Sequence, residues 1–72
     1  MSAMNIFYRE RADEARKGAA AASLDNVRNR WLQSEASWIE LAVRSERAEA
    51  MRDKLIVEKA AERAAADETA PA

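Results

Sequence analysis

The 72-residue chain contains no cysteine and no histidine. Disulfides are therefore excluded, and a structural zinc site is not expected, because its ligands are mainly those two residue types. A single glycine and a single proline leave the chain almost without its two strongest breakers of regular structure. Much of the 49 % apolar content is alanine, which favours helix but buries little area. The composition predicts a small all-α protein.

Long hydrophobic runs are also missing. The apolar run Ile6-Phe7-Tyr8 is too short for a secretory signal and is followed at once by Arg9. No run approaches the roughly 20 apolar residues of a membrane span. We therefore expect a cytoplasmic protein without a membrane span.

No excess of charge of one sign is present either. The chain has twelve basic and thirteen acidic residues, and positive and negative side chains alternate closely along it. Such alternation is typical of a solvated helix surface, whereas phosphate neutralisation requires concentrated positive charge. The arginines from Arg28 to Arg47 are interrupted by Glu40 and Glu46, which argues against a nucleic-acid surface.

The N-terminal part of the chain predicts a first helix at about residues 4–22. Ser2 and Asn5 are both suitable caps for its start. Residues with spacings of four and three, which share one helix face, form a narrow line of mostly small side chains. These residues are Tyr8, Ala12, Ala15, Ala19 and Ala22. Met4, Ile6 and Phe7 form an apolar group at its start, which we expect to pack on the second helix or on a partner chain.

The centre of the chain predicts a second, longer helix at about residues 24–65. An apolar line with alternating three- and four-residue spacing averages 3.5 residues per turn, which is typical of a coiled coil. The line comprises Leu24, Val27, Trp31, Ser34, Trp38, Leu41, Ser45, Ala48, Met51 and Leu55. A stack of Trp31 and Trp38 on a ligand is an alternative, but tryptophans one heptad apart on an apolar face usually belong to a core.

The junction between the two predicted helices leaves two arrangements open. At about 100° per residue, the apolar lines of the two helices point roughly 120° apart if the helix runs straight through. A turn within residues 20–26 would let both lines face one core and give an αα-hairpin, which we favour. Ser23 and Asp25 are suitable caps for the second helix. The alternative is one continuous helix whose apolar line shifts.

A short helix folded back on a long one leaves the second half of the long helix uncovered. That half contains apolar residues from Met51 to Val57. Because soluble oligomers are mostly symmetric and dimers are commonest, we expect a homodimeric helical bundle or coiled coil. The predicted interface residues are Tyr8, Leu24, Val27, Trp31, Trp38, Leu41, Met51 and Leu55. We expect a single domain over residues 1–67 and a disordered tail over 68–72.

Residue types that carry catalysis are scarce. Carboxylate pairs such as Glu46/Glu49 have no histidine beside them for a di-metal site or for acid–base work. One glycine excludes the phosphate-binding glycine motifs. We therefore expect no enzyme, no catalytic residue, no cofactor and no metal. The sequence favours a structural or protein-interaction module that self-associates and also binds a further protein. The alternative is a small regulator that binds nucleic acid or a transcription component.

The arrangement Tyr8-Arg9…Ala12, followed by Asn26-Val27-Arg28 and Trp38, resembles a group of short uncharacterised bacterial helical proteins. The resemblance covers most of residues 8–52. It implies a bacterial source and a compact helical protein. No activity and no functional residue come with it.

Overall fold

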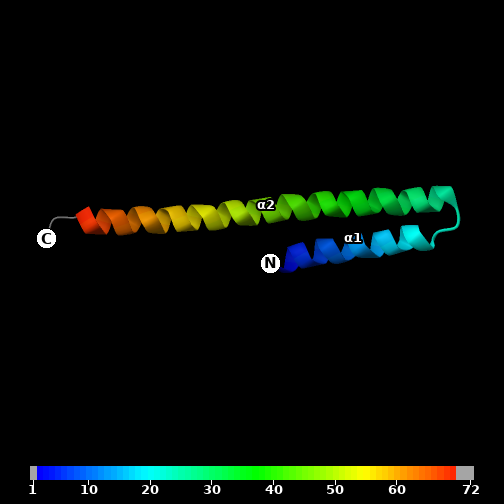
Figure 1. The fold of residues 1–72 in the computed structure, drawn as a ribbon, viewed down its shortest axis with the longest axis horizontal. Helices are drawn as coiled ribbons and strands as arrows, with labels where there is room; N and C mark the ends of the chain where they lie inside the picture. Colours follow the sequence, from blue (N-terminus) through cyan, green and yellow to red (C-terminus); the bar gives the residue numbers. More distant parts are fainter. Residues whose placement is uncertain (1, 70–72) are drawn as a thin grey trace.

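The computed structural model describes residues 2–69 and contains two helices within that range, α1 at Ala3–Ala21 and α2 at Asp25–Thr69. The two helices lie side by side and antiparallel, joined by a short turn at one end (Figure 1). The predicted all-α hairpin with one short and one long helix is therefore confirmed. The helix bounds differ from the predicted ones by one residue at three ends and by four at the end of α2.

Helix α1 begins where a side chain caps it. Ser2 has an extended backbone, and its Oγ accepts a hydrogen bond from the backbone N–H of Asn5 at 3.3 Å. Of the two expected caps, Ser2 therefore serves and Asn5 lies inside the helix. The helix ends at Ala21 because Ala22 returns to an extended conformation, with φ −73° and ψ 131°. The face of α1 that packs against α2 carries its buried residues, which are Asn5, Ala12, Ala15 and Ala19.

The turn comprises residues 22–24 and needs neither glycine nor positive φ in the described residues. Arg28 closes it: its Nη2 donates to the Ala22 carbonyl at 3.0 Å, and its Nη1 pairs with Asp25 at 3.2 Å. The Leu24 carbonyl accepts the first helical bond of α2, so Asp25 is the first residue of the helix and not its cap. The turn falls within the predicted range, and the continuous-helix alternative is wrong.

Helix α2 is more than twice as long as α1. Its 45 residues span about 67 Å at 1.5 Å per residue, which accounts for most of the 74 Å length of the molecule. The 19 residues of α1 cover the first half of α2 and leave the second half as a single helix (Figure 1). Of the expected tail at 68–72, Glu68 and Thr69 lie in α2, and residues 70–72 are outside the described range.

Candidate interaction surface

The contact between the two helices is built mainly from alanine. The buried alanines, which are at most 6 % exposed, are Ala12, Ala15 and Ala19 of α1 and Ala42 of α2. Side chains this small let the helix backbones approach closely but remove little apolar area from water. The spacing of the α1 alanines predicted this face correctly.

Gly18 provides the closest approach at the turn end of the hairpin. A Cβ built on Gly18 would lie 2.5 Å from Cε2 and 2.9 Å from Cε3 of Trp31. The indole ring of Trp31 therefore rests on the bare backbone of α1, although the residue remains 41 % exposed. Glycine at this helical position lowers helix propensity and in return makes room for the ring.

Three aromatic rings meet at the other end of α1. Phe7 meets Trp38 edge-on with ring centroids 5.8 Å apart, and Tyr8 stacks on Trp38 at 6.1 Å. Such pairs contribute about 0.5–1.5 kcal/mol beyond their buried area. The Arg11 guanidinium lies 5.5 Å from the Phe7 centroid, in a cation–π arrangement. Trp38 is half-buried and anchors the start of α1 on α2.

Polar contacts between the helices lie beside the aromatic cluster. Asn5 is only 2 % exposed, and its Nδ2 donates to the carboxylate of Glu49 at 2.5 Å. One turn further, Arg9 donates to both oxygens of Glu46, from Nε at 3.2 Å and from Nη2 at 2.7 Å. The hydrogen bond from Arg9 lowers the pKa of the Glu46 carboxyl below its ordinary value. These two contacts fix the axial position of α1 along α2.

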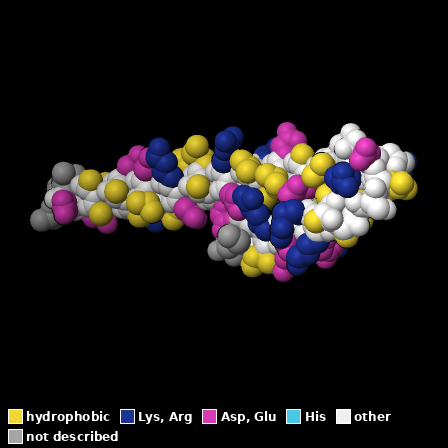
Figure 2. All heavy atoms as spheres, turned by 45° about the vertical axis from the view of Figure 1, so that its right-hand side comes forward, with side chains coloured by type: hydrophobic (Ala, Val, Ile, Leu, Met, Phe, Trp, Pro, Cys, Tyr) yellow, Lys and Arg dark blue, Asp and Glu magenta, His cyan; other side chains and the backbone are white. Residues whose placement is uncertain are grey.

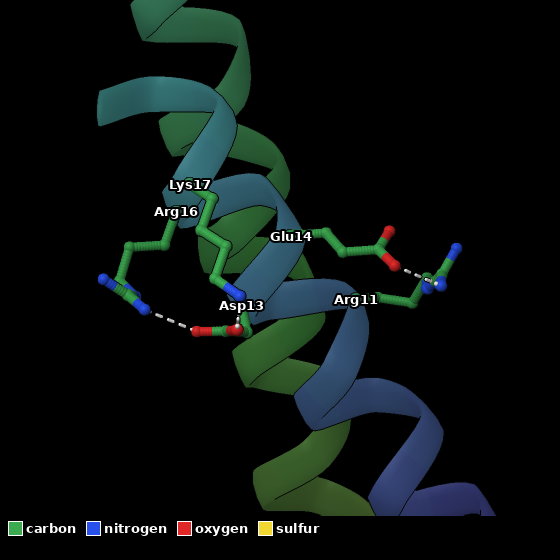
Figure 3. Close-up of polar contacts among 5 residues, drawn as sticks. All are labelled: Arg11, Asp13, Glu14, Arg16 and Lys17. Carbon is green, nitrogen blue, oxygen red and sulfur yellow. Dashed lines mark hydrogen bonds and ion pairs between the residues drawn. The ribbon is translucent and has the colours of Figure 1, made fainter. Parts of the chain in front are cut away.

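The outer face of α1 carries ion pairs within the helix. Asp13 lies between Arg16 and Lys17, with N–O distances of 2.6 and 3.0 Å, while Arg11 pairs with Glu14 at 2.6 Å (Figure 3). The hydrogen bonds from Arg16 and Lys17 lower the pKa of Asp13. Pairs of this spacing at an exposed surface add little to the stability of a helix. They support α1 and mark no binding site.

The second half of α2 exposes large apolar side chains. Every residue from 50 to 68 is exposed, whereas Glu49, opposite Asn5, is still partly covered. The exposed fractions are 56 % for Met51, 54 % for Leu55, 66 % for Ile56 and 67 % for Val57. Hydrophobic side chains project from the single-helix end of the molecule in Figure 2. A lone helix cannot bury these residues.

The predicted interface residues fall into two groups. Tyr8, Val27 and Trp38 are half-buried, and Trp31 contacts Gly18 within the hairpin. The remaining ones are exposed: Leu24 at the turn, Leu41 on the flank of α2, and Met51 and Leu55 beyond the end of α1. Ala42, and not Leu41, is fully buried, because it lies four residues after Trp38 on the face towards α1.

The sequence reasoning missed Asn5 and Gly18 as contact residues. Asn5 was considered only as a cap, although it lies three residues before Tyr8 and so continues the spacing of the α1 contact face. Gly18 lies outside the predicted apolar line of α1. Its position three residues after the buried Ala15 was the available signal that it faces α2.

The structure offers little that resembles a ligand site. A shallow depression of about 380 Å³ lies beside the turn and is lined by Val27, Arg30, Trp31 and Ser34. Within residues 2–69, no group of three or more acidic side chains is placed to hold a metal ion. Neither described helix has a stretch long and apolar enough to cross a membrane. The exposed apolar half of α2 is therefore the most distinctive surface of the molecule.

We found no match to this chain among protein-family models, curated proteins or solved structures.

Proposed function

We propose that this protein is a non-catalytic interaction module that self-associates as a homodimer through coiled-coil packing of its helices. The observation that carries the proposal is the exposed apolar half of α2, where residues as large as Ile56 and Val57 are about two-thirds exposed. Large apolar side chains left in water at this density favour association with another surface.

The small core of the hairpin supports the same proposal. Its buried apolar residues in the described part are four alanines, and the larger side chains are at best half-buried. A domain of this size without disulfides or metal usually needs a partner to reach useful stability. Association would add the burial that the hairpin lacks.

A bacterial cytoplasmic setting belongs to the same proposal. The resemblance to short bacterial helical proteins motivates it. In that setting the self-associated module would offer its remaining exposed surface to a further protein partner. Phe7, Trp31 and Leu41, which are 36–43 % exposed, are available for such a contact.

Sedimentation equilibrium over a range from low to high micromolar concentration tests the proposal. A chain of 8.0 kDa is expected to shift towards twice that mass as concentration rises. A constant monomer mass over the whole range would contradict self-association. Because apolar contact is the stated driving force, raising the salt concentration should leave the dimer intact.

A further inference from the structure

Two surface depressions on α2 have the same form. The first, of about 380 Å³, lies beside the turn, and the second, of about 280 Å³, lies on the half of α2 beyond α1. Each is lined by four residues at sequence spacings of three, one and three. The linings are Val27, Arg30, Trp31 and Ser34 for the first depression and Leu55, Glu58, Lys59 and Glu62 for the second. In coiled-coil packing, four residues of one helix form the hole that receives a side chain of the facing helix.

The two depressions lie on one heptad line. Leu55 lies 28 residues, or four heptads, after Val27, and Leu41 lies midway between them. A line with this period keeps facing one neighbour when two helices supercoil. Leu41 lies about 100° around α2 from the fully buried Ala42, so α1 stands beside the line. Because Leu41 is 36 % exposed and Leu55 is 54 % exposed, the line is open to a second helix.

Each depression includes the apolar side chain that fits the other one. In an antiparallel pair of α2 helices with its two-fold axis at about residue 43, Leu55 of one copy lies opposite the middle of the first depression of the other. The same axis places Val27 opposite the middle of the second depression. One arrangement therefore fills all the depressions of both copies. It also sets small residues opposite large ones, such as Ala48 opposite Trp38.

The linings of the two depressions carry opposite net charge. Arg30 is the charged residue of the first lining, whereas the second has two acidic residues and one basic residue, a net charge of −1. The antiparallel arrangement brings Arg30 of one copy close to Glu58 of the other, whereas a parallel pair sets each beside its own counterpart. Within residues 2–69 the Arg30 guanidinium has no ion-pair partner, so it is available for this contact.

We propose that α2 pairs antiparallel with α2 of a second copy along the line from Val27 to Leu55, and that these two side chains fill the depressions of the other copy. The proposal rests on the proposed self-association and specifies its surface, register and orientation. The pair would cover Trp31, Leu41 and Leu55, which are 36–54 % exposed in the single chain. The two copies of Arg44 would lie close to the axis, where their like charges oppose the pairing.

Charge reversal tests this arrangement by sedimentation equilibrium, with helicity checked by circular dichroism. Arg30→Glu and Glu58→Arg should each weaken the dimer by about tenfold, because each sets like charges together at two symmetric places. The two changes combined in one chain should restore the dimer to within about threefold of the parent. Arg44→Ala should strengthen it. Arg47→Glu is the matched control and should have little effect, since it lies about 120° around α2 from Leu41.

The outcomes separate this interface from self-association itself. Weakening by each single reversal and recovery in the combined variant supports the antiparallel pair. A combined variant no stronger than the single ones would overturn it, because the two charges would then act apart. A dimer that neither reversal weakens would overturn this interface and leave self-association standing. A monomer at every concentration of the parent chain would overturn both.

Discussion

At the scale of single residues, the hairpin depends on matching small side chains with large ones. Gly18 leaves the α1 backbone bare where the indole of Trp31 lies on it. Trp38 instead fills the space between Phe7 and Tyr8 at the start of α1. Each tryptophan thus packs against a different part of α1. Two substitutions separate these contributions.

Replacing Gly18 with valine tests the first contact. Valine has slightly higher helix propensity than glycine, so a loss of stability can come only from its clash with the Trp31 ring. We expect the free energy of unfolding to fall by about 1–3 kcal/mol, as in other overpacked contacts. Urea unfolding followed by circular dichroism would measure the change. The control Ala20→Val, at an exposed position of α1, should cost only about 0.5 kcal/mol. A Gly18→Val variant as stable as the parent would contradict the contact.

Replacing Trp38 with alanine tests the second contact. The variant loses its two aromatic partners and the cover of the half-buried ring. We expect a loss of about 3 kcal/mol in the free energy of unfolding, the low end for such truncations. Trp31→Ala should cost less, because that residue is 41 % exposed. If Trp38→Ala changed the free energy of unfolding by less than about 0.5 kcal/mol, the ring would contribute no more to stability than an exposed side chain does.

At the scale of the helices, α1 depends on α2. Most helical stability in proteins comes from tertiary packing, so we expect the packing of α1 against α2 to supply most of the stability of α1. The alanine face sets the close approach of the two helices. The contacts of Asn5 with Glu49 and of Arg9 with Glu46 set their axial position. The register of the hairpin is therefore fixed by polar groups and its spacing by small ones.

The ion pairs predict that the hairpin is acid-sensitive. The pKa values of Glu46 and Asp13 lie below their ordinary 4.5 and 3.8, because each carboxylate accepts hydrogen bonds from basic side chains. The unfolded chain therefore binds protons first as the pH falls. The stabilisation is fully present above the ordinary pKa values and is lost as the pH falls through the lower folded values. Urea unfolding from pH 6 down to pH 3 should show this loss.

The variant Glu46→Gln is the matched control for that titration. It keeps the shape of the side chain but cannot titrate, so its stability should fall less steeply over the same pH range. Equal slopes for the parent and Glu46→Gln would show that the contact with Arg9 adds nothing to the pH dependence. The measurement needs a low protein concentration, at which self-association does not contribute.

At the scale of the whole molecule, the two halves of α2 differ in how much they pack against the rest of the protein. The first half of α2 packs against α1, and the second half lies alone in solvent (Figure 1). Helix propensity from the alanines of residues 60–66 favours the second half, but α1 does not extend along it. The stability of that half should depend on association.

Hydrogen exchange measured by mass spectrometry checks this difference. At low concentration, we expect amides of residues 51–69 to exchange faster than those of residues 27–49, because local opening there does not disrupt the packing of α1 on α2. Raising the concentration should slow exchange in residues 51–69 as the dimer forms. Residues 27–49 are the internal control and should change little. Uniform protection at every concentration would contradict the division.

Local patterns predicted much of the fold. The alanine spacing of α1 identified its contact face, and the mismatch of the two apolar lines indicated a turn within residues 20–26. The predicted line along α2 held from Val27 to Trp38 and then diverged from the observed face at Leu41. A line with an average spacing of 3.5 residues continues to Leu41 and Met51, whereas the 3.6-residue turn of an α-helix brings Ala42 to the side of α1. The polar contact of Asn5 with Glu49 joins residues too distant in sequence for periodicity to pair.

The sequence by itself determined that this protein is all-α, that its two helices are unequal, and that the longer one has apolar residues beyond the reach of the shorter. These properties follow from composition, helix propensity and side-chain spacing, which act locally. Only the tertiary structure decided that Gly18 receives Trp31, that Ala42 is buried in place of Leu41, and where α1 stops along α2. Those outcomes depend on the distance and register of two helices, which residues far apart in the chain set together.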